Sequence, residues 1–125
     1  MGYTVFRADD AAFTPPSGGD RTRAVLRLSD ALRSMRANVW RMPAGTRGRR
    51  HIELVQEELF VTLSGTAILL VGDPPERVDL PAGSLLIVEP QTPLQLANDS
   101  DDDALVLIVG APPEQGRVEY LPDAP

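Results

Sequence analysis

Short apolar segments alternate with breaks of proline, glycine and polar residues along the whole chain. The segments are four to eight residues long and rich in Val, Leu and Ile, a composition typical of β-strands. Many short strands at regular spacing predict an all-β fold, built as an antiparallel sandwich or barrel. We expect strands at residues 3–7, 23–28, 35–42, 51–54, 58–64, 66–71, 76–80, 84–88, 93–98 and 104–110, with an edge piece at 118–121.

Little helix is expected. Residues 29–33 fit one helical turn, with Ser29 or Asp30 as its cap, and no other segment keeps a helical period. The chain has 125 residues, of which 42% are hydrophobic, and this suits a single domain over residues 1–125 with one modest core. The longest apolar runs are five to seven residues, whereas a membrane-spanning helix needs roughly 20.

Composition excludes several kinds of chemistry. The chain has no cysteine, so disulfides, thiolate catalysis and zinc–thiolate sites are excluded. Because it also lacks the pattern of a signal peptide, we expect a cytoplasmic protein. The net charge of −6 argues against general binding to nucleic acid or to anionic membranes. The aspartates at 99 and 101–103 lack the spacing of a calcium loop and indicate a solvated turn.

Residues 45–65 carry a spaced set of glycine, histidine and glutamate. Gly45 is followed by five residues and His51, then by one residue and Glu53, by four residues and Glu58, and by six residues and Gly65. This order resembles the first motif of the cupin family. It departs from that motif at Glu53, where the family has a second histidine.

Residues 83–98 resemble the second cupin motif more weakly. Gly83 and Asn98 fall in place, but Glu89 and Gln91 stand for the motif's proline and glycine, and Leu94 stands where the motif has a histidine. The resemblance implies a double-stranded β-helix, or jelly-roll barrel, with a site in its mouth. It also implies a homodimer, which we expect to form through the N-terminal strands because open sheet edges tend to be covered or paired.

His51 and Glu53 are two residues apart on a predicted strand. Side chains alternate across a strand, so both face the same side, with Cα atoms roughly 6–7 Å apart. Glu58 opens the next strand and resembles the family's glutamate ligand. The resemblance therefore implies a metal set of His51, Glu53 and Glu58, since Leu94 cannot be a ligand.

The chain's single histidine limits what such a site can do. No site of two histidines and one carboxylate can form within one chain, which argues against an iron dioxygenase of the usual cupin sort. An oxygen-rich set favours weak binding of a divalent metal, such as manganese, magnesium, zinc or nickel. Without metal, His51 and Glu53 are the candidate catalytic pair, with the carboxylate fixing the tautomer of a general base.

The leading interpretation is a small-molecule-binding barrel with a degenerate, weak metal site. The alternatives are a metal-dependent cupin enzyme, such as an isomerase, lyase or oxygenase-like protein, and a metal-free proton-transfer enzyme. Arginines before the motif strand suit a small acidic ligand, because guanidinium groups bind carboxylate and phosphate. The residues expected to line the pocket are Trp40, Arg47, Arg49, Phe60, Thr62, Leu94 and Leu96.

Overall fold

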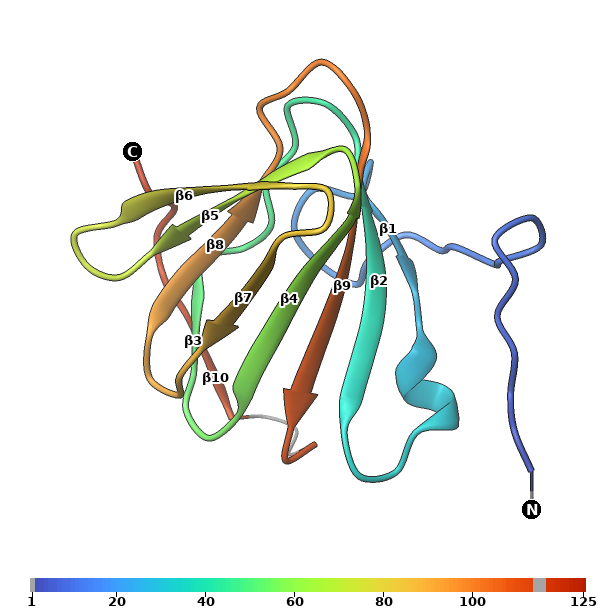
Figure 1. Cartoon of the computed structure of the whole chain (residues 1–125). Helices are drawn as coiled ribbons and strands as arrows, with labels where there is room; N and C mark the ends of the chain where they lie inside the picture. Colours follow the sequence, from blue (N-terminus) through green and yellow to red (C-terminus); the bar gives the residue numbers. More distant parts are fainter. Residues whose placement is uncertain (1, 114–116) are drawn as a thin grey trace.

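The protein is built from two five-stranded antiparallel sheets that face each other (Figure 1). The computed structural model describes residues 2–113 and 117–125. One sheet has the strand order β1-β2-β9-β4-β7 and the other β10-β3-β8-β5-β6. The strands are β1 (Ala24–Leu26), β2 (Arg36–Met42), β3 (His51–Glu53), β4 (Glu57–Ser64), β5 (Thr66–Val71), β6 (Glu76–Pro81), β7 (Leu85–Val88), β8 (Pro93–Ala97), β9 (Ala104–Ala111) and β10 (Val118–Tyr120). The predicted all-β barrel of two antiparallel sheets is therefore confirmed.

The core fills one end of the space between the sheets. Strand alternation points every second side chain inward, as on β4, where Phe60 is buried and its neighbours along the chain are not. The buried cluster comprises Met42, Phe60, Ala67, Leu69, Leu80, Val88, Leu94, Leu96, Ala104 and Val106. Met42 and Ala104 pair at one end of β2 and β9, so the packed core closes that end and leaves the other end for polar inward residues.

The N-terminal segment departs from the prediction. Residues 3–7 form no strand, and the segment projects away from the sheets (Figure 1). Tyr3, Val5 and Phe6 are exposed, and the first ladder contact is an isolated bridge between Thr14 and Val25. The apolar pattern there resembles a strand, but in the described chain no neighbouring strand pairs with it.

The predicted helical turn is a 3₁₀ turn, η1 (Leu28–Ala31), and its expected cap was wrong. Arg27 takes the N-cap position and makes no side-chain cap. The Ser29 hydroxyl instead binds β2, donating to the Ala37 carbonyl at 3.1 Å and accepting from the Ala37 amide at 3.0 Å.

Among the described residues, no helix is long and apolar enough to cross a membrane.

Two motif residues have structural roles. Gly65 joins β4 to β5 with a φ of +72°, and a Cβ there would collide with the main chain at Asp103. Asn98 follows β8 and is 1% exposed. Its amide nitrogen donates at 2.8 Å to the carbonyls of both Met42 and Asp102. The motif positions of Gly65 and Asn98 therefore fix the turns that join the strands.

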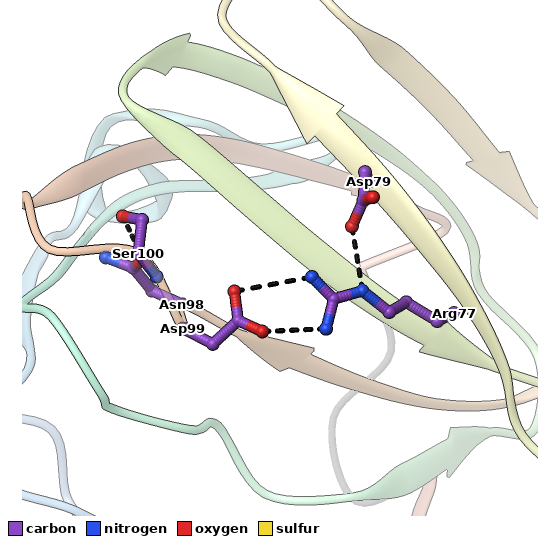
Figure 2. Close-up of polar contacts among 5 residues, drawn as sticks. All are labelled: Arg77, Asp79, Asn98, Asp99 and Ser100. Carbon is purple, nitrogen blue, oxygen red and sulfur yellow. Dashed lines mark hydrogen bonds and ion pairs between the residues drawn. The ribbon is translucent and has the colours of Figure 1, made fainter.

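Side-chain contacts hold the start of the aspartate-rich loop after β8 (Figure 2). At its start the Asn98 side-chain oxygen accepts from the amide and the hydroxyl of Ser100, at 3.0 and 2.7 Å. Arg77 on β6 reaches the next residue, Asp99, with donor–acceptor distances of 2.7 and 3.4 Å, and Asp79 with 2.9 Å. The loop is an exposed turn, as predicted, with Asp99 in an ion pair rather than free in solvent.

Candidate functional site

A cavity of about 270 Å³ opens between the sheets next to the packed core, whose Phe60, Leu94 and Leu96 form part of its wall. Side chains from both sheets line it, since β2, β4 and β9 belong to one sheet and β3, β8 and β10 to the other. Its walls combine apolar groups with histidine, glutamate and arginine, the mixture that small-molecule sites commonly show. The described lining residues central to its chemistry are Arg23, Arg36, Trp40, Arg49, His51, Glu53, Glu58, Phe60, Leu94, Leu96 and Tyr120.

His51 and Glu53 point into this cavity from β3. Their Nε2 and Oε2 atoms are 3.3 Å apart, so the spacing of two residues does place both side chains on one face. His51 Nδ1 lies 2.9 Å from the main-chain carbonyl oxygen of Arg49. Because a carbonyl only accepts, Nδ1 carries a hydrogen and Nε2 is the atom left to bind a proton or a metal ion.

Glu58 approaches the same point from the opposite sheet. It is the first inward residue of β4 and is 9% exposed. Ligand atoms of His51, Glu53 and Glu58 all lie within 4.8 Å of one another. Glu58 Oε1 is buried and has no hydrogen-bond partner among the described residues. The three residues thus form one cluster with an unsatisfied carboxylate oxygen, a costly feature unless a proton or a cation binds there.

The cluster has shifted proton affinities. Burial raises the pKa of Glu58 to about 7, and the charge of Glu53 adds to this, while His51 and Arg36 oppose it. Burial alone would lower the pKa of His51, but the hydrogen bonds to Glu53 and to the Arg49 carbonyl, with the charges of Glu58 and Glu53, outweigh burial and raise it. Glu58 therefore changes protonation state near neutral pH.

The same cluster fits a divalent cation. His51 Nε2 and Glu53 Oε2 are 3.3 Å apart, close enough for both atoms to bind one ion. The unpartnered oxygen of Glu58 supplies a third donor. One imidazole and two carboxylates would hold the ion, which would supply a Lewis acid for a carbonyl or phosphoryl oxygen.

Leucines form the wall beside His51. Leu94 on β8 is the direct cross-strand partner of His51 and is 1% exposed. Leu96 lies two residues further along β8, and Phe60 and Trp40 face them from the other sheet. The position that holds a histidine in the second motif is thus an apolar contact for whatever occupies the cavity.

Two residues expected at the pocket do not line it. Arg47 turns away because its guanidinium donates to the carbonyl of Ala124 at 2.9 Å. Thr62 shares the inward face of β4 but lies beyond Phe60, towards the packed end, where it is 1% exposed. Arg49 does line the cavity, and its guanidinium lies 3.5 Å from the centre of the Tyr120 ring.

Several lining residues are absent from the sequence-based set. Arg36 and Asn38 share the parity of Trp40 on β2, so strand alternation was a signal that could have found them. Gln56 lies in the loop between β3 and β4, and Tyr120 pairs with His51 from β10. No local pattern marks these last two, because their place depends on pairing between distant segments.

Comparisons with known proteins agree with this architecture. The family described as "Cupin domain" matches residues 38–110, more than half of the chain, and the chain belongs to this family. No curated protein matches the sequence. The fold and the site thus define a small cupin barrel with one histidine and two glutamates in its mouth.

Solved structures share the fold at low sequence identity. The polyketide cyclase RemF from Streptomyces resistomycificus is 16% identical with a TM-score of 0.82, over 100% of this chain and 90% of that one. A double-stranded β-helix protein from Klebsiella pneumoniae is 21% identical with a TM-score of 0.76, over 98% and 100%. A sugar phosphate isomerase of the cupin superfamily from Silicibacter pomeroyi is 22% identical with a TM-score of 0.73, over 86% and 74%. These likenesses confirm the cupin double-stranded β-helix.

Proposed function

We propose that the protein binds a small molecule in the cavity, beside a weakly held divalent cation at His51, Glu53 and Glu58. The observation that carries this proposal is the convergence of the three ligand atoms within 4.8 Å. The buried, unpartnered Oε1 of Glu58 supports it, because a cation would satisfy that oxygen. The Nδ1 contact to the Arg49 carbonyl also supports it, since it leaves Nε2 of His51 available.

The donor set predicts weak binding of a hard or borderline metal. Two of the three donors are carboxylates, which suit manganese and magnesium, while the imidazole also suits zinc and nickel. Leu94 contributes no fourth ligand. Affinity is therefore expected well below that of closed sites with four protein ligands.

Glu57 and Glu58 offer a matched test. They are neighbours on β4, but Glu57 is exposed and Glu58 is buried in the cavity. In calorimetric titrations with Mn²⁺, Glu58→Gln is expected to weaken binding at least ~10-fold, about 1.4 kcal/mol, while Glu57→Gln leaves it unchanged. A stoichiometric metal held tightly through purification and lost on His51→Ala would contradict the weak site. Equal Mn²⁺ binding by both glutamine variants would contradict the ligand set.

Metal-free proton transfer is the second candidate function. It is favoured by the pKa of about 7 for Glu58, which suits a general acid or base at neutral pH. The fixed tautomer of His51 provides a second group whose Nε2 faces the cavity. Two solved structures of the same fold are those of a sugar phosphate isomerase and a polyketide cyclase. This candidate predicts that turnover of the protein's substrate persists in the presence of a chelator and is lost in Glu58→Gln. Substrate turnover that is restored only by added metal would contradict it.

A further inference from the structure

Four arginines line the same cavity as the histidine and the two glutamates. They are Arg23, Arg27, Arg36 and Arg49. Among residues 2–113 and 117–125, none of the four has a carboxylate within ion-pair distance. The chain as a whole is acidic, with a net charge of −6. Positive charge is therefore gathered in the cavity of an otherwise negative protein, without protein counter-ions in direct contact.

Arg23 is the most constrained of these cations. It is only 5% exposed. Main-chain carbonyls hold its guanidinium, with Nε donating to Asp20 and Nη2 to Gly18, both at 2.9 Å. The guanidinium carbon also lies 4.9 Å from the centre of the Trp40 ring. Carbonyls and a ring orient the side chain but do not neutralise it, so Arg23 presents a buried charge at a fixed place.

Arg49 lies beside Arg23 against one loop. A Cβ built on Gly19 would lie 2.6 Å from Nη2 of Arg23 and 3.0 Å from Cγ of Arg49. A Cβ on Gly18 would lie 3.0 Å from Nη1 of Arg49. The positively charged side chains of Arg23 and Arg49 thus both pack against the loop at Gly18 and Gly19. The charge of Arg49, added to burial, lowers the pKa of Arg23.

The carboxylates nearby do not remove this charge. Asp20 acts on Arg23 electrostatically, but its Oδ1 is bound by the amide and hydroxyl of Thr22, at 2.9 and 2.6 Å. The charge of Arg36 acts instead on Glu58, whose pKa it lowers. Arg23 and Arg49 therefore remain as a cation pair, and a pair of planar guanidinium groups suits a carboxylate or a phosphate.

We infer that the cavity takes a small organic anion whose carboxylate or phosphate group binds between Arg23 and Arg49, with its body directed towards His51. This inference rests on the proposed function, and it adds the ligand's charge and size. The cavity volume of about 270 Å³ lies just below the usual range of ligand sites, about 300–1,000 Å³, so the molecule is small. Leu94, Leu96 and Phe60 provide apolar contact for a short carbon skeleton.

Arg49→Gln tests the inference with Arg33→Gln as its control. Arg49 is exposed, so its replacement is expected to leave folding intact, and Arg33 is an exposed arginine outside the cavity with the same change in net charge. Inorganic phosphate and malonate are titrated separately by calorimetry and by thermal unfolding at constant ionic strength. We expect saturable stabilisation of the wild-type protein and of Arg33→Gln. Arg49→Gln is expected to bind at least ~10-fold more weakly.

The outcomes separate the two proposals. Binding of phosphate alone indicates a phosphorylated ligand, binding of malonate alone indicates a carboxylic acid, and binding of both supports the shared chemistry. If neither probe stabilises the wild type, or if all three proteins respond alike, the anion site is wrong. Mn²⁺ titration of the same proteins is independent of this result: Mn²⁺ binding without anion binding overturns only the present inference, and anion binding without Mn²⁺ binding overturns only the metal site.

Discussion

His51 on β3 and Leu94 on β8 are direct cross-strand partners, so the residue opposite the chain's single histidine is apolar. Directly opposed residues in an antiparallel pair have Cβ atoms about 4.5–5.5 Å apart and point to the same face. A histidine at position 94 would therefore project into the cavity beside His51. The proposed metal site therefore lacks a second imidazole at this register position.

Leu94→His is expected to strengthen metal binding at least ~10-fold, because it adds a second imidazole to the cluster. Without metal, the polar group in a buried position should cost about 1–3 kcal/mol of unfolding free energy. Calorimetry with Zn²⁺ or Ni²⁺, and urea unfolding with and without the metal, measure both effects. Leu96→His is the control, since Leu96 lines the same wall but does not pair with His51. An equal increase in metal affinity in the two variants would show that direct pairing with His51 is not what strengthens metal binding at position 94.

Stability of the metal-free protein should fall as pH rises from about 4.5 to 7. The folded-state pKa of Glu58 is raised from 4.5 to about 7, so the unfolded state releases its proton first and stability is lost as pH rises through the folded value. The raised pKa of His51 acts in the same sense. Glu58→Gln should remove roughly 2–3 kcal/mol of this loss, as seen in urea unfolding at pH 5 and pH 8.

Glu57→Gln is the control for this pH effect. It makes the same change in net charge at an exposed neighbouring position. Its stability should fall with pH as the wild type does, because an exposed carboxylate loses little hydration on folding. A slope in Glu58→Gln that matches the slopes of the other two proteins would refute the assignment to Glu58.

Exposed apolar side chains lie on the outer face of the sheet β1-β2-β9-β4-β7, and they predict a dimer. Leu63, Leu85 and Ile87 are 49%, 64% and 71% exposed, and β7 is the edge strand of that sheet. A contiguous exposed apolar face of this kind commonly marks a protein interface. We expect a dimer in light scattering after size exclusion and a shift towards monomer in Ile87→Glu. Leu54→Glu, at an exposed leucine in the loop after β3, should leave the mass unchanged.

Removal of residues 1–7 tests the other route to a dimer. The N-terminal segment exposes Tyr3, Val5 and Phe6 and has no strand partner among the described residues. If pairing of these segments forms the dimer, the truncated protein becomes monomeric while Ile87→Glu does not. A wild-type protein that stays monomeric at high concentration would argue against both routes.

Asn98→Ala is expected to destabilise the fold by about 2–3 kcal/mol. Its buried side chain binds the carbonyls of Met42 on β2 and Asp102 in its own loop, and it also binds Ser100 (Figure 2). Removal leaves a buried carbonyl without its donor. Asp99→Ala should change little by comparison, because the ion pair with Arg77 is solvent-exposed. Urea unfolding of both variants makes the comparison, and a larger effect at Asp99 would contradict it.

Local patterns sufficed for most of the fold. Strand alternation and the breaks between strands predicted the bounds of β2, β5 and β9 to within about a residue. These strands carry buried apolar side chains, which give a clear pattern in the sequence. The segment at residues 3–7 was mispredicted, since its apolar pattern has no partner strand within the described chain. Propensity alone does not make a strand; a neighbouring edge must also be present.

Some residues of the candidate site were predicted from the sequence, and others were not. The resemblance to the first cupin motif implied the cluster of His51, Glu53 and Glu58, while strand alternation accounted for the shared face of His51 and Glu53. Arg23 and Tyr120 were missed, since they reach the cavity from segments far away in sequence. Tyr120 is placed by the pairing of β10 with β3, and pairings over such separations leave no periodic signal in the sequence.

Arg49 contributes to the cavity through two separate parts of one residue. Its main-chain carbonyl fixes the tautomer of His51, and its side chain lies over Tyr120 beside Arg23. Substitution changes only the side chain. Replacement of residue 49 can therefore change the cavity wall beside Tyr120 and Arg23 while the imidazole of His51 keeps its orientation.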